Sequence, residues 1–208
     1  MAIGDLATDE GAEVVAQAAV AAFGGIDILV NNAGGAHEGE ASWFSTPIHA
    51  ILASYDTNTV AAIRLIRGLA PAMKERGWGR IINIATAAAV TPTSGQPDYG
   101  PSKAAMINMS LGLSKALKNS GVTSNCVSPG MVRTQGLGAY LADFAQQRGL
   151  EGVAEAERVM LKGIGQTVGR VGEVDDVAYV VTMLASPRSD FVNGTNIHVD
   201  GGISPSVN

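Results

Sequence analysis

The chain has 208 residues, 46% hydrophobic and 16% charged, so it is long enough and apolar enough to bury one sizeable core. Its net charge of -5 and the lack of any Lys or Arg run argue against nucleic acid or an anionic membrane as a partner. No stretch has the length of a membrane span, and Cys126 is the only cysteine, so we expect a cytoplasmic protein without an internal disulfide.

Helix-like segments alternate with apolar, β-branched runs along the sequence. The first helix should have Thr8 or Asp9 as its N-cap and end at Gly24-Gly25, while Pro71 should kink or interrupt the long helix and Gly121 should cap the next. In chain order, we expect a helix over 9–23, a strand over 26–32, a long helix over 48–76, a strand over 79–85, a helix over 98–119, a strand over 122–128, one or two mobile helices over 134–158, a helix over 173–186 and a strand over 195–202. This order predicts a parallel sheet with helices on both faces.

The stretch "QPDYGPSKAAM" places Tyr99 and Lys103 one helical turn apart. Residues at i and i+4 share a helix face, so the phenol and the ammonium can lie close together. A free tyrosine titrates near pH ~10, and a neighbouring positive charge favours its phenolate. The pair therefore suits proton transfer, although a surface Tyr beside a solvated Lys would give the same pattern.

The sequence around this pair resembles the short-chain dehydrogenase/reductase family at several points, in the right order. The matching stretches are "NNAG" at 31–34, "DTNTVAAI" with Asn58, "GRIINIAT" with Thr86, "YGPSK", "SPGMVRT" and "FVNGTNIHVDGG". The resemblance covers about 4–202. It implies a single α/β domain over 1–208 with a three-layer, Rossmann-like, doubly wound parallel sheet, N-terminally incomplete.

The resemblance also implies roles for individual residues. Tyr99 would be the general acid or base, and Lys103 would lower its pKa and hold the nicotinamide ribose. Asn58 would support a proton-relay water. Thr86 stands where the family usually has a serine, and its hydroxyl could still bond a substrate oxygen while its methyl narrows the pocket.

The implied reaction is hydride transfer between the nicotinamide of NAD or NADP and a small carbonyl or alcohol substrate. The sequence leaves the direction of the reaction open. The residues implied in cofactor binding are Asp5, Asn32, Ala33, Gly34, Tyr99, Lys103, Pro129, Gly130, Val132 and Thr134. No metal is expected, because His37, His49 and His198 lie far apart in the sequence and near no acidic or thiol cluster.

One expected feature is missing from the sequence. A dinucleotide-binding unit starts with a strand that enters a glycine-rich turn, but no G-x-G-x-x-G lies between a strand and a helix here. "MAIGDL" resembles the end of the family's third strand, so two strands and most of a third, about fifty residues, would be absent. We expect either a piece of a longer reductase or a short form with weakened nucleotide binding and an exposed strand edge at 26–31.

Three functions stay open at this level. The first is an NAD(P)-dependent reductase or dehydrogenase, with the 3-oxoacyl reductases as one type. The second is a non-catalytic remnant that serves as a binding or assembly module. The third is a related dehalogenase without nucleotide, which Lys103 disfavours because those enzymes resemble the family but carry Arg there.

Two expectations concern larger parts of the chain. The helices bearing Asn58 and Tyr99 should pair with their copies in a homodimer or homotetramer, through small residues such as Ala61, Ala62, Ala104 and Ala105. The segment 135–162 should close over the substrate as a lid, since glycines interrupt it and its core signal is weak.

Overall fold

The computed structural model describes residues 1–36, 42–92 and 95–204, and it confirms the predicted order of helices and strands. The elements are α1 (Asp9–Phe23), β1 (Ile28–Asn31), α2 (Ile48–Tyr55), the π-helical turn η1 (Asp56–Val60), α3 (Ala61–Arg76), β2 (Gly79–Ile84), the 3₁₀ turn η2 (Ala87–Ala89), α4 (Tyr99–Ala116), β3 (Val122–Pro129), α5 (Gln135–Arg148), α6 (Val153–Gly163), α7 (Val174–Ala185), the 3₁₀ turn η3 (Pro187–Ser189) and β4 (Asn196–Val199). His37 lies outside the described residues.

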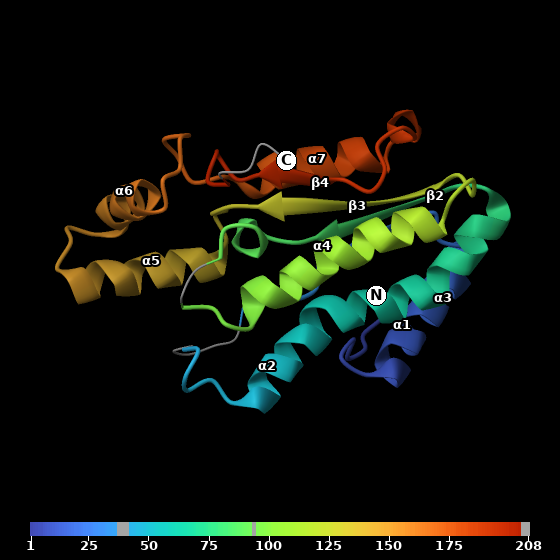
Figure 1. Cartoon of the computed structure of the whole chain (residues 1–208), viewed down its shortest axis with the longest axis horizontal. Helices are drawn as coiled ribbons and strands as arrows, with labels where there is room; N and C mark the ends of the chain where they lie inside the picture. The colour runs from blue at the N-terminus through green and yellow to red at the C-terminus, as the bar shows by residue number, and fades with distance from the viewer. Residues whose placement is uncertain (37–41, 93–94, 205–208) are drawn as a thin grey trace.

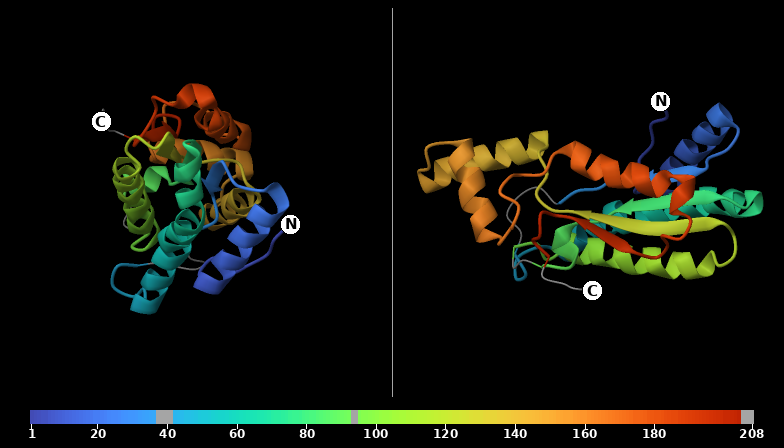
Figure 2. Two further views of the ribbon diagram at one scale, coloured as in Figure 1. Left: turned by 90° about the vertical axis from the view of Figure 1, so that its right-hand side faces the viewer. Right: turned by 90° about the horizontal axis from the view of Figure 1, so that it is seen from above.

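The four strands form one parallel sheet in the order β1-β2-β3-β4, with helices on both faces (Figures 1 and 2). Successive residues of a strand point to opposite faces, and β2 shows the consequence. Ile81 joins the core beneath α1 and α3, whereas Ile82 packs with Val127 and Leu184 beneath α7. The three-layer α/β fold predicted from the sequence is confirmed.

The first helix begins and ends where the sequence predicts. The Thr8 hydroxyl accepts a hydrogen bond from the Gly11 amide at 3.0 Å, and Gly24 ends the helix with a left-handed φ of 73°. The prediction that Gly121 caps α4 is wrong, because Leu117 is the C-cap. Gly121, with φ 74°, instead starts the approach to β3, where a Cβ would collide with the Gly77 carbonyl oxygen.

The long helix predicted over 48–76 is interrupted at η1 and not at Pro71, which lies inside α3. Pro71 has no N–H to donate to the Arg67 carbonyl one turn back. Both residues are exposed, so water can replace the missing hydrogen bond. Next to η1, Ala61 and Ala62 are 4% exposed and belong to the chain's own core. Ala61 and Ala62 therefore offer little surface to another subunit, whereas Ala104 and Ala105 are half-buried, and pairing of these helices with their copies stays a prediction.

The predicted lid segment folds as α5 and α6, which project beyond the carboxyl ends of the strands (Figures 1 and 2). These helices contact chiefly each other, around a small cluster with Leu141, Ala145 and Ala156 at its centre. Closure over a substrate stays a prediction. In the part of the chain that the structure describes, no helix is long and apolar enough to cross a membrane.

Candidate active site

The candidate site lies where β1, β2 and β3 end. These strands run parallel, so the segments that follow them meet at one edge of the sheet. Thr86 follows β2 and caps η2, accepting a hydrogen bond from the Ala88 amide at 3.3 Å. Tyr99 is the first residue of α4. The approach of these two segments is close, since a Cβ on Gly100 would lie 2.9 Å from the Ala88 carbonyl oxygen.

Tyr99 is half-buried, and its surroundings decide how readily its phenol ionises. Burial raises the pKa of the Tyr99 phenol above its ordinary value, and the facing Thr86 hydroxyl lowers it in part. Burial and Thr86 account for this shift, and the lowering of the phenol pKa by Lys103 stays a prediction. At neutral pH the phenol is therefore protonated and able to donate.

Lys103 carries the buried ammonium of the site. The residue is 3% exposed, and its Nζ donates a hydrogen bond to the Ile84 carbonyl oxygen at 2.7 Å. Burial lowers the pKa of Lys103 to about 8, an effect that Cys126 opposes slightly. An ammonium has three donors, and within the described residues only the Ile84 carbonyl accepts from it. A Cβ on Gly34 would lie 3.3 Å from Nζ, so the free donors border the loop after β1.

Asn58 is fully buried in η1 and braces that same loop. Its Oδ1 accepts a hydrogen bond from the Gly35 amide at 2.9 Å, and its Nδ2 donates to the Gly35 carbonyl at 3.0 Å. Nδ2 also lies 3.2 Å from the hydroxyls of both Ser54 and Ser102. The side chain is thus occupied by protein partners, and its support of a relay water stays a prediction.

The residues expected to bind a cofactor near β1 fall into two groups. Asn32, Ala33 and Gly34 are exposed just beyond the end of the strand, and Gly34 has φ 139°, a conformation that favours glycine. Asp5 has a local task in the structure: its Oδ1 accepts a hydrogen bond from the Ala7 amide at 2.9 Å in the turn before α1.

The residues expected to bind a cofactor after β3 line the turn that leads into α5. Pro129 ends β3, and the Gly130 amide donates to the Val199 carbonyl at 3.0 Å, so tightly that a Cβ on Gly130 would lie 2.7 Å from the Asp200 Cα. Val132 forms a parallel bridge with Gly172. The Thr134 hydroxyl caps α5 by accepting from the Leu137 amide at 3.2 Å.

A row of hydrogen-bonded polar side chains, not predicted from the sequence, is buried behind the site. The Asn31 amide donates to Asn83 Oδ1 at 2.8 Å, the Asn83 amide donates to Ser110 at 3.1 Å, and Ser110 lies 2.8 Å from Ser124. Polar side chains inside apolar strands need buried hydrogen-bond partners, so the asparagines of "ILVNN" and "IINIA" could have indicated these bonds from the sequence. The serines beside Asn58 had no comparable signal.

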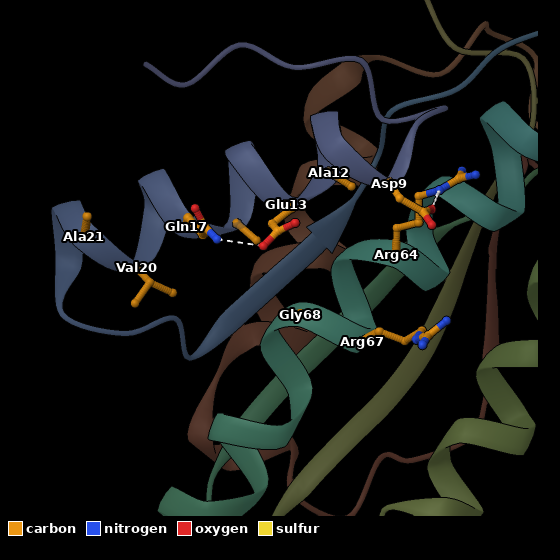
Figure 3. Close-up of a pocket in the computed structure, with 10 residues that line it drawn as sticks. Asp9, Ala12, Glu13, Gln17, Val20, Ala21, Arg64, Arg67 and Gly68 are labelled. Carbon is orange, nitrogen blue, oxygen red and sulfur yellow. Dashed lines mark hydrogen bonds and ion pairs between the residues drawn. The ribbon is translucent and has the colours of Figure 1, made fainter.

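A large hollow lies away from these residues. It has a volume of about 770 Å³ and opens between α1 and α3, where Arg64 forms an ion pair with Asp9 (Figure 3). None of the expected catalytic residues lines it. A smaller hollow of about 390 Å³ adjoins the turn after β3 and is lined by Val132, His198 and Asp200 among others. The described residues contain no cluster suited to a metal ion.

Comparison with known proteins places this geometry in a family. Residues 2–204 match the family model described as enoyl-(acyl carrier protein) reductase. The chain is 34% identical to D-beta-hydroxybutyrate dehydrogenase from Rhizobium meliloti (strain 1021), covering 86% of this chain and 68% of that protein. It is 32% identical to the 3-oxoacyl-(acyl-carrier-protein) reductase of Haemophilus influenzae, with coverage of 87% and 68%.

A solved structure shares the fold. L-sorbose reductase from Gluconobacter frateurii, complexed with NADPH and L-sorbose, superposes with a TM-score of 0.91 at 28% identity, over 98% of this chain and 76% of that one. Fold, site and relatives together define an enzyme of the oxidoreductase class. The chain belongs to the short-chain dehydrogenase/reductase family, as the sequence predicts.

Proposed function

We propose that the chain interconverts an alcohol and a ketone or aldehyde with NAD or NADP, using Tyr99, Thr86, Lys103 and Asn58. The observation that carries the proposal is that the Tyr99 phenol faces the Thr86 hydroxyl where the strands end, while the same helix bears the buried Lys103 ammonium, whose remaining donors no described residue uses. The relatives named above include a dehydrogenase and two reductases, one of them complexed with NADPH.

The donors of Lys103 fit the ribose of a nicotinamide nucleotide. A buried ammonium that bonds only one carbonyl leaves two N–H groups for ligand oxygens, and ribose offers two neighbouring hydroxyls. The exposed turn at Asn32, Ala33 and Gly34 borders the same space. When bound, the nicotinamide would supply or accept the hydride.

Proton transfer falls to Tyr99. Because burial raises the pKa of its phenol, Tyr99 holds a proton at neutral pH and can give it to a carbonyl oxygen that is gaining charge. The Thr86 hydroxyl can donate to the same oxygen and steady it. In the oxidation of an alcohol the proton moves the other way. A bound ligand that accepts hydrogen bonds from Lys103 would favour the phenolate by holding the Lys103 ammonium near the phenol.

The fit is poorer for the rest of the dinucleotide. The sequence contains no G-x-G-x-x-G, the pattern that holds a pyrophosphate between a strand and a helix. Each missing amide removes a hydrogen bond worth about 1 kcal/mol or more. We expect isothermal titration calorimetry of this chain with NADH and with NADPH to give dissociation constants above the micromolar range, and micromolar affinity would contradict the expectation.

Two narrower readings go with the proposal. Similarity to the Haemophilus influenzae protein makes 3-oxoacyl compounds the first substrates to test. The alternative, a non-catalytic binding or assembly module, rests on the absence of the glycine-rich turn from these residues. Turnover of a panel of carbonyl compounds at high nucleotide concentration separates the two readings.

The role of Tyr99 is tested by Tyr99→Phe, which removes only the hydroxyl. We expect turnover to fall by about 10²–10⁴-fold, the range typical of a general acid or base. Tyr179→Phe is the matched control, since Tyr179 is 75% exposed on α7. Undiminished turnover in Tyr99→Phe would exclude the proposed mechanism.

A further inference from the structure

Ser102 connects the two halves of the candidate site through its hydroxyl. The residue is fully buried in α4, directly before Lys103. Its Oγ donates a hydrogen bond to the Tyr99 carbonyl oxygen at 2.8 Å and lies 3.2 Å from the Asn58 amide nitrogen, which donates to it. One hydroxyl thus joins the first turn of α4 to η1.

A second bond fixes the same two elements. The Thr59 hydroxyl donates to the Ser102 carbonyl oxygen at 2.6 Å, beside the bond from Asn58. Asn58 extends these contacts to the loop after β1, because its side chain forms hydrogen bonds with both the amide and the carbonyl of Gly35. The connected path therefore runs from the loop after β1, through Asn58 and Ser102, to the backbone of Tyr99.

We propose that Ser102 is a positioning residue, which fixes the start of α4, and with it Tyr99, against η1 and the Gly34–Gly35 turn. The effect of Ser102 on catalysis rests on the function proposed above for Tyr99. Ser102 itself touches no reacting atom in this scheme. It acts by keeping the phenol and the loop that borders Lys103 in one fixed relation.

A purely local role would account for part of these contacts. A helical serine often bonds a carbonyl one turn back, and Ser114 of the same helix does so with the Leu111 carbonyl at 2.7 Å. Ser114 is also buried, at 7% exposure. Ser102 differs because its hydroxyl also accepts the bond from Asn58, on another element. Comparing the two serines therefore separates positioning from local helix stabilisation.

The first experiment compares turnover in Ser102→Ala and Ser114→Ala. Small displacements of a reacting group can reduce rates by about 10²-fold, so we expect kcat at saturating nucleotide to fall about ten-fold or more in Ser102→Ala. Ser114→Ala should stay within about two-fold of the unchanged chain, and Ser102→Thr, which keeps the hydroxyl, should recover most of the loss. Equal losses in both alanine variants, or none in Ser102→Ala, would overturn the proposal.

A second experiment needs no turnover. Tyrosine labelled with ¹³C at Cζ gives one resonance for each of the four tyrosines, and Tyr99→Phe identifies the one from Tyr99. We expect this resonance to move in Ser102→Ala and to stay in Ser114→Ala and Ser102→Thr. An unmoved resonance in Ser102→Ala would refute the positioning role, whereas inactivity of the unchanged chain alone would refute only the proposed function.

Folding is checked in every variant by its thermal unfolding midpoint. Should Ser102→Ala fail to fold, Ser102→Cys takes its place, because a thiol fills the same space and forms weaker hydrogen bonds. The same outcomes then apply: a moved Tyr99 resonance supports the proposal, and an unmoved one overturns it.

Discussion

Lys103 shows how a single residue can work against stability at a functional site. Burial lowers the pKa of Lys103 to about 8 in the folded chain, below its ordinary value of 10.5. Between these two pH values the unfolded chain binds more protons, so the contribution of Lys103 to the free energy of unfolding rises with pH. Its destabilising effect is fully present below pH 8 and is relieved as the pH rises toward 10.5.

The variant Lys103→Met tests this relation. We expect the free energy of unfolding of the unchanged chain, minus that of the variant, to increase by about 1–3 kcal/mol from pH 7.5 to pH 10, on the order of the shift at 1.4 kcal/mol per pH unit. Urea unfolding at both pH values measures it. Other titrating groups occur in both chains and largely cancel, except Cys126, whose thiol pKa Lys103 itself lowers. A difference that does not change with pH would contradict the burial of a charged Lys103.

Cys126 lies beside this ammonium but should be inert. It is fully buried in β3, and burial raises the pKa of its thiol to about 11 from its ordinary value of 9.0. A shift of this size lowers the thiolate fraction about 100-fold near neutral pH. We therefore expect iodoacetamide at pH 8 to alkylate the folded chain at least ~100-fold more slowly than the urea-unfolded chain. Comparable rates, followed by mass spectrometry, would show that the strand opens readily.

At the scale of elements, local signals were predicted well and tertiary ones were not. Thr8 and Gly24 bound α1 because a cap depends on the residues next to it in the sequence. The interruption at η1 could not be predicted, since Asn58 there bonds Gly35 on a distant loop. A π-helical turn inside a helix often marks a functional site.

The same distinction applies to the candidate site. Tyr99 and Lys103 could be found from their spacing on one helix, and the resemblance to the family supplied Asn58 and Thr86. The direction of the Tyr99 pKa could not be predicted, because it depends on how deeply the folded chain buries the phenol. Ser102 escaped notice for a similar reason: only folding brings it beside Asn58.

The helices α5 and α6 should open more easily than the sheet and its covering helices. Their cluster around Leu141 is small, and they contact chiefly each other. Arg133 links them to the main body by exposed ion pairs with Glu157 and Glu173, and exposed pairs are worth about 1 kcal/mol or less. We expect amide hydrogen exchange in α5 and α6 to be faster than in α4. Equal protection in mass-spectrometric exchange would mean that α5 and α6 open only when the whole chain unfolds.

At the scale of the molecule, the sheet presents an apolar edge. Among the described residues β1 pairs only with β2, and α7 lies over β2, β3 and β4. Ile28 and Val30, on the face of β1 away from α1 and α3, are 44% and 40% exposed. An edge strand with exposed β-branched residues tends to pair with another chain, so we expect self-association through β1.

Placing a charge on this edge should weaken the association, because a strand pairing would then bury a lysine. We expect Val30→Lys to lower the weight-average mass in sedimentation equilibrium, at a protein concentration where the unchanged chain associates. Val14→Lys is the control, because Val14 is 53% exposed and lies on the helix α1 rather than on a strand. An equal fall in mass for both variants would point to net charge as the cause. An unchanged mass in Val30→Lys would mean that the chains contact each other elsewhere. The half-buried face of α4 around Ala104 and Ala105 would then be the next surface to test.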